Sequence, residues 1–108
     1  MILPYIEIKE AVYDSYISLH ENSGYPIQDT LFATIGDYDF SDEYGQTDEC
    51  CIYINFAIIL INKNKNFDFM KGKLIELLDD RQIDLFKSDL GNEFHEFLND
   101  VNIVKCHL

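Results

Sequence analysis

The fold depends on the most apolar stretch of the chain, Thr47-Asp48-Glu49-Cys50-Cys51-Ile52-Tyr53-Ile54-Asn55-Phe56-Ala57-Ile58-Ile59-Leu60-Ile61-Asn62. As a strand, its alternate residues would form an entirely apolar face, and isoleucine favours strands. As a helix, Thr47 would cap the start, and Asp48 and Glu49 would meet the positive end of the helix dipole. Two lysines would then follow the negative end. The charges at both ends favour the helix.

Five other segments have apolar residues at the three- and four-residue spacing of a helix face. The first follows Pro4 and ends before Gly24, although residues 2–8 alone also fit a strand. In the second, Asp29 or Thr30 would cap a short helix that ends at the next glycine. The five apolar stripes are Tyr5-Ile8-Val12-Tyr16-Leu19, Leu31-Phe32-Ile35, Phe67-Met70-Leu74-Leu77-Leu78, Ile83-Phe86-Leu90 and Leu90-Phe94-Phe97-Leu98-Val101-Val104-Leu108.

These segments predict an all-α fold, a compact bundle of about five helices that forms one globular domain over residues 1–108. The alternative is an α+β fold in which residues 50–61 form a central strand. Apolar residues make up 47% of the chain, so it can bury a single core despite its high charge.

Negative charge is concentrated in one half of the chain. The net charge is −12, and residues 10–62 contain ten carboxylates without a single Lys or Arg. After Asn62, nine carboxylates are accompanied by seven basic residues, so the charge nearly balances. This asymmetry indicates a basic partner. It argues against nucleic acid and anionic membranes as direct ligands, because both require positive charge.

The acidic half is centred on Gly36-Asp37-Tyr38-Asp39-Phe40-Ser41-Asp42-Glu43-Tyr44-Gly45, which we expect to be a loop. Carboxylates on such a loop would speed encounter with a basic partner, and aromatic rings would supply contact energy. The alternative is a solvated loop whose aromatic rings only fill the core. We predict a partner-binding face of six carboxylates with three aromatic anchors: Asp37, Asp39, Asp42, Glu43, Asp48 and Glu49 with Tyr38, Phe40 and Tyr44.

Neither a metal site nor a catalytic group is predicted. The spacing from Asp37 to Asp48 resembles an EF-hand calcium loop, but Asp42 occupies the position of its invariant glycine. The adjacent pair Cys50-Cys51 is expected to fill core space, and Cys106-His107 lacks a third group to orient it. The histidines do not have metal-ligand spacing. We therefore expect no enzyme activity, no cofactor and no metal.

We expect the chain to be cytoplasmic. Its N-terminus has no basic segment before an apolar core, so a secretory signal is not expected. The apolar run from Cys50 to Ile61 is interrupted by Asn55 and is too short to span a bilayer. Three cysteines, two of them adjacent, fit a reducing compartment.

A small, strongly acidic, mostly helical chain with tyrosines among carboxylates resembles the immunity proteins of bacterial toxin–immunity pairs, of the contact-dependent growth inhibition type. The resemblance rests on Asp37-Tyr38-Asp39-Phe40-Ser41-Asp42-Glu43-Tyr44, on Thr47-Asp48-Glu49-Cys50-Cys51-Ile52-Tyr53, and on the closing Glu96-Phe97-Leu98-Asn99-Asp100-Val101. It covers the whole chain in character, without a diagnostic motif.

This resemblance implies a cytoplasmic inhibitor that binds a cognate toxin domain, often a nuclease, and covers its basic active-site cleft with an acidic surface. The inhibitor would act by steric occlusion. One alternative is an acidic nucleic-acid mimic or regulatory adaptor that binds another basic protein. A small enzyme or a metal-dependent switch is the other.

Overall fold

The computed structural model describes residues 3–108, and the regular elements among them are all helical. In chain order they are α1 (Tyr5–Ser15), the π-helix η1 (Tyr16–Asn22), α2 (Ile27–Gly36), α3 (Gly45–Asn62), α4 (Asp68–Leu77), α5 (Asp80–Leu90), the 3₁₀-helix η2 (Gly91–Glu93) and α6 (Phe94–Lys105). The predicted all-α bundle is confirmed. The alternative with a strand over residues 50–61 is wrong, because that segment lies within α3.

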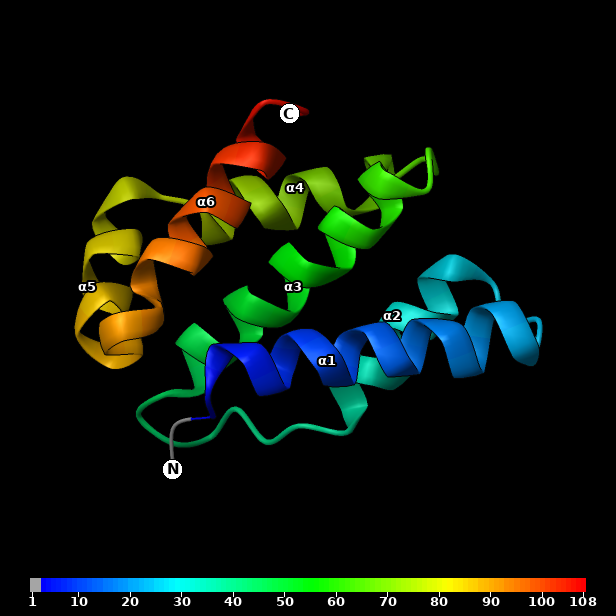
Figure 1. The fold of residues 1–108 in the computed structure, drawn as a ribbon, viewed down its shortest axis with the longest axis horizontal. Helices are drawn as coiled ribbons and strands as arrows, with labels where there is room; N and C mark the ends of the chain where they lie inside the picture. The colour runs from blue at the N-terminus through cyan, green and yellow to red at the C-terminus, as the bar shows by residue number, and fades with distance from the viewer. Residues whose placement is uncertain (1–2) are drawn as a thin grey trace.

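The central helix of the bundle is α3, which contacts α1, α2, α4 and α6 (Figure 1). Twelve of its eighteen residues are buried, so neighbouring helices cover it on several sides. That burial explains why its sequence has no single apolar stripe. The predicted cap is wrong: the helix begins at Gly45, and the Thr47 hydroxyl instead donates to Asp89 Oδ2 of α5 at 2.5 Å.

The first helix packs its predicted stripe against α3 and then widens into the π-helix η1. Gly24 follows η1 with φ +76°, which is the left-handed backbone expected after a helix end. Tyr5 and its neighbours are helical, so the strand alternative is wrong from that residue onward, while Ile2 lies outside the described residues. Glu93 caps the N-terminus of α1 from another part of the chain. Its two carboxylate oxygens accept the backbone N–H groups of Tyr5 and Ile6 at 2.9 and 3.1 Å.

The second helix begins earlier than predicted. Ile27 directly follows Pro26, so the predicted caps Asp29 and Thr30 lie inside α2. The Thr30 hydroxyl donates back to the Pro26 carbonyl at 3.0 Å. Phe32, predicted in the apolar stripe, is 55% exposed because α2 buries a narrower face than the spacing suggests.

The last three helices follow the predicted stripes, except that Leu108 lies beyond the end of α6 and is 43% exposed. The stripe of α4 is buried as predicted. The start of α5 is earlier than predicted because the Asp79 side chain accepts the Arg81 N–H and acts as its N-cap. Gly91, with φ +55°, separates α5 from α6. Phe86 and Phe97 then meet edge to face at 5.9 Å between ring centroids, which joins the two helices through the core.

Within residues 3–108, none of the helices combines the length and apolar character that crossing a membrane requires.

Candidate protein-binding surface

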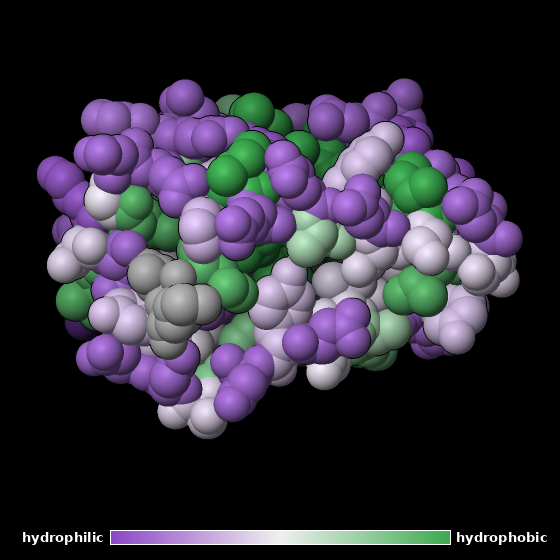
Figure 2. All heavy atoms as spheres, turned by 60° about the horizontal axis from the view of Figure 1, so that its bottom comes forward, coloured by the Kyte–Doolittle hydropathy of each residue, from purple (hydrophilic) through white to green (hydrophobic). Residues whose placement is uncertain are grey.

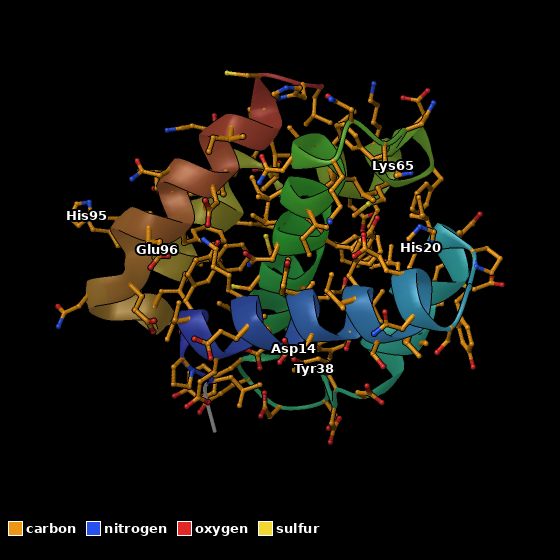
Figure 3. The ribbon with its side chains drawn as sticks, turned by 45° about the vertical axis from the view of Figure 1, so that its right-hand side comes forward. Asp14, His20, Tyr38, Lys65, His95 and Glu96 are labelled. Carbon is orange, nitrogen blue, oxygen red and sulfur yellow. The ribbon has the colours of Figure 1, made fainter. Side chains whose placement is uncertain are left out.

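The predicted loop is present and connects α2 to α3 over residues 37–44; we call it the acidic loop. It crosses the molecule below α1 in two different views (Figures 1 and 3). Asp37, Asp39, Asp42 and Glu43 are all exposed on it. Four of the six predicted surface carboxylates therefore lie together on one short segment.

Side chains of the acidic loop fix its own backbone. Asp39 Oδ1 accepts the Ser41 N–H at 2.9 Å, and Asp42 Oδ1 accepts the Tyr44 N–H at 2.9 Å. These are the local turns that Asp favours. Each bond holds a local turn of the loop, and a turn that is already formed lowers the entropy lost on binding.

Gly45 makes the end of the acidic loop tight. A Cβ atom at this position would lie 1.9 Å from the carbonyl oxygen of Phe40, far inside van der Waals contact. Only glycine lets the Phe40 backbone approach the start of α3 this closely. The shape of the loop therefore depends on a residue just outside it.

The aromatic residues of the loop lie partly beneath its charges. Tyr38 and Phe40 are half-buried against the core, and their rings are stacked with centroids 6.3 Å apart. In Figure 3, Tyr38 points from the loop toward α1. Burial, followed by the negative charge of Asp37, raises the pKa of the Tyr38 phenol. Tyr38 and Phe40 support the loop, while Tyr44, also half-buried, has its pKa raised chiefly by neighbouring Glu43.

The other two predicted carboxylates do not lie on the exposed face. Asp48 is only 4% exposed, because the first turn of α3 is covered by its neighbours. Glu49 is half-buried, and its Oε1 pairs with Lys73 Nζ of α4 at 3.0 Å. The prediction that Asp48 and Glu49 belong to an exposed partner-binding face is therefore wrong, and the other four predicted carboxylates all lie on the acidic loop.

Asp48 has an unusual environment for a carboxylate. Its Oδ1 is buried and has no hydrogen-bond partner in the described part of the chain. Burial and the nearby carboxylates of Asp42 and Asp89 together raise the pKa of Asp48 from 3.8 to about 6. Asp48 therefore loses its proton less readily than an ordinary aspartate, and no sequence pattern indicates this.

Carboxylates on α1 extend the negative surface. Glu7, Glu10 and Asp14 are exposed, and none of them forms an ion pair with another residue between 3 and 108. The sequence placed them outside the apolar stripe of this helix but did not assign them to a binding face. Figure 2 shows hydrophilic residues spread over this side of the molecule with less polar residues between them.

The cysteines and histidines of the described residues have mostly structural surroundings. Burial raises the pKa of the Cys50 thiol to about 12 and that of Cys51 well above its usual value, so both thiols stay protonated and fill core space as predicted. His20 and His107 each place Nδ1 against a backbone carbonyl. Across the described chain, no three His, Cys, Asp or Glu side chains gather in a way that holds a metal ion.

No protein-family model matches the chain, and no curated protein or solved structure matches it either.

Proposed function

We propose that this chain is an immunity protein that binds the active domain of a cognate bacterial toxin and covers the basic cleft of that domain. The observation that carries the proposal is the acidic loop. It holds four exposed carboxylates in a fixed shape, within a span that has no Lys or Arg. A surface of this kind complements a cationic cleft.

The mechanism follows from how nucleases hold their substrates. A nuclease binds phosphates through Lys and Arg in its cleft, and attraction between opposite charges speeds the approach of an acidic protein. Because the loop is already ordered by its own hydrogen bonds, less entropy is lost when it docks. The toxin is blocked by steric occlusion in the cytoplasm, and this chain performs no chemistry.

The contact residues in this proposal are Asp37, Asp39, Asp42 and Glu43, with Tyr44 beside them. Tyr38 and Phe40 hold the loop in place from the core side. Interfaces of this type draw their specificity and association rate from charge and much of their affinity from buried aromatic contacts. We assign the toxin's own apolar residues to the space around Tyr44.

Co-expression tests the biological role directly. The gene immediately upstream of this one is taken as the candidate toxin gene. The C-terminal domain of its product is expressed alone and together with this chain. We expect the domain to arrest growth alone and the chain to restore growth. Unrelieved toxicity, or an upstream domain without toxicity, contradicts the immunity role. Capture of a basic cellular protein that is not a toxin would support the adaptor alternative.

Two charge variants then test the surface. The loop variant carries Asp37→Asn, Asp39→Asn and Glu43→Gln. Asparagine at position 39 keeps a side-chain oxygen that can accept the Ser41 N–H. The control variant removes three exposed carboxylates elsewhere: Glu76→Gln, Asp80→Asn and Asp84→Asn. We expect the loop variant to associate with the toxin domain about tenfold more slowly and with weaker dependence on salt. Equal kinetics for the two variants would reject the acidic loop as the contact.

A further inference from the structure

A groove lies between α1 and the second half of α3, and none of the residues that line it belongs to the acidic loop. It encloses about 560 Å³, within the usual range for ligand pockets. Ile58 and Ile59 form its inner wall, and Ile6 and Tyr13 line it from α1. We call it the α1–α3 groove.

Two large side chains of the groove remain in contact with solvent. Ile6 is 43% exposed and Tyr13 is 49% exposed, although both border an apolar wall. Exposed apolar side chains around a concave surface are typical of a binding site. A partner that covered them would gain the free energy of removing this area from water.

A buried polar group also borders the groove. Asn55 is 2% exposed, and its Nδ2 donates to the Cys51 carbonyl at 2.8 Å. Its Oδ1 has no hydrogen-bond partner within residues 3–108. A buried acceptor without a donor is costly, and Asn55 gives the apolar wall of the groove a polar point beneath its surface.

The charged side chains around the groove determine whether a positively or a negatively charged occupant is favoured. Lys9 is paired with Glu96 and Asp100 of α6 at 3.3 and 2.9 Å. Lys63 is paired with Glu21 at 3.0 Å. Both cations of the groove are therefore already neutralised.

Glu10 and Asp14 are the opposite case. They lie one turn apart on the same face of α1 and line the groove. Both are exposed, and neither forms an ion pair in the described structure. The groove therefore favours a cationic occupant.

The length of the groove fits a helix. Ile6 and Tyr13 lie two turns apart on α1, which is about 10 Å along its axis. Two turns of a docked helix present apolar anchors at positions i, i+3 or i+4, and i+7. We propose that the α1–α3 groove binds a basic amphipathic α-helix of a partner polypeptide, with its apolar face on Ile58, Ile59 and Tyr13 and its cations beside Glu10 and Asp14.

This site is separate from the acidic loop and does not depend on the immunity role. The probe is a synthetic Leu/Lys peptide of about 14 residues whose leucines follow i, i+3, i+4 and i+7. A scrambled peptide of the same composition controls for simple attraction to a protein of charge −12. We expect the amphipathic peptide to bind at least tenfold more tightly than the scrambled one. When it binds, the protein's backbone amide NMR shifts should change mainly on α1 and the second half of α3.

Variants separate the groove from the rest of the acidic surface. Tyr13→Ala should weaken peptide binding about tenfold, while Tyr25→Ala, at a tyrosine of similar exposure outside the groove, should leave it within twofold. Glu10→Gln with Asp14→Asn should weaken it several-fold and reduce its salt dependence.

The matched charge control is Asp37→Asn with Asp39→Asn, which removes two charges from the acidic loop. We expect the control to bind the peptide like the parent chain. Equal binding of the scrambled peptide overturns the proposal, and so does equal weakening by the control or a set of NMR shifts centred on the loop. None of these three outcomes affects the toxin experiment.

Discussion

At the scale of single residues, the acidic half of the chain divides into exposed and buried carboxylates. The exposure of Asp37, Asp39, Asp42 and Glu43 follows from a polar segment bounded by two glycines, so the sequence predicts it. The raised pKa of Asp48 depends on its burial and on the charges of Asp42 and Asp89, and Asp89 reaches the start of α3 from α5. These are tertiary contacts between distant segments, and no local pattern encodes them.

The first prediction concerns Asp48. Its pKa is raised from 3.8 to about 6 in the folded chain, so the folded state favours the protonated carboxyl. The stabilisation that this gives is complete below about pH 4 and is lost as the pH rises through about 6. At pH 7.5 we expect Asp48→Asn to raise the free energy of unfolding by about 1–2 kcal/mol, which raises the unfolding temperature by several degrees. At about pH 4 we expect no difference from the parent chain.

Thermal unfolding followed by circular dichroism between about pH 4 and pH 8 measures this difference. Asp84→Asn is the matched control, because Asp84 is exposed on α5. Its unfolding temperature should follow the parent curve across the whole range. An offset between Asp48→Asn and the parent that does not change with pH would contradict the role of the Asp48 proton.

The second prediction concerns Gly45. A Cβ atom there would lie 1.9 Å from the Phe40 carbonyl oxygen, so Gly45→Ala must displace the loop or the start of α3. We expect the free energy of unfolding to fall by about 2 kcal/mol, measured by urea titration. Gly36→Ala, at the other end of the loop, meets no atom within 4 Å and should be close to neutral. Equal effects of the two changes would show that the approach of Phe40 is not tight in solution.

At the scale of the elements, the sequence predicts that α3 is a helix but does not predict where α3 begins. Acidic residues at its start and lysines after its end indicate a helix, and the structure confirms it. The helix nevertheless begins two residues before the predicted cap, because Thr47 bonds to Asp89 and the turn enters the helix at Gly45. Charge reveals the type of element, whereas its boundary depends on a partner from another helix.

A polar cluster joins α1 to α6, and spacing does not predict it. The Tyr5 hydroxyl and Lys9 Nζ both donate to Asp100 Oδ2, at 2.5 and 2.9 Å. Tyr5 is fully buried and Asp100 is 7% exposed, so these bonds lie at the edge of the core. The sequence places Tyr5 in an apolar stripe and Asp100 in the closing segment, and only the packing of α1 against α6 brings them together.

The third prediction concerns this cluster. Asp100→Asn removes the charge that holds Lys9 and weakens the acceptor of the buried Tyr5 hydroxyl, so we expect a loss of about 2–3 kcal/mol in unfolding free energy. A double-mutant cycle with Tyr5→Phe should give a coupling energy of about 1 kcal/mol. The exposed pair Lys105–Asp80, 3.0 Å apart, is the control, and Asp80→Asn should cost under about 1 kcal/mol. Additive effects of Tyr5→Phe and Asp100→Asn would show that the two side chains do not act together.

At the scale of the whole molecule, the uneven distribution of charge lowers the stability of the folded chain. The ten carboxylates of residues 10–62 repel one another without a local cation, and the ion pairs that some of them form reach lysines from later in the chain. Self-repulsion of this kind destabilises a compact state. The sequence predicts this asymmetry fully, because counting charges needs no fold. It does not predict how the charges divide among the acidic loop, the face of α1 and the buried start of α3.

The fourth prediction follows from that asymmetry and uses the two charge variants defined above. The loop variant removes charges that repel their neighbours, so it should unfold at a higher temperature than the parent chain in low salt. The control variant removes charges near lysines, including Asp80 beside Lys105 and Glu76 beside Lys73, so it should be no more stable than the parent. Added salt should shrink the gain of the loop variant, because screening already weakens the repulsion in the parent.

Differential scanning calorimetry at about 10 mM and about 500 mM salt measures both effects. If the acidic loop serves a basic partner, the variant that gains stability must also be the one that loses association rate, since the same carboxylates cause both. A loop variant that is less stable than the parent in low salt would mean that local turns, and not repulsion, dominate these residues. In that case folding alone accounts for these carboxylates, unless the loop variant also associates more slowly with the toxin domain.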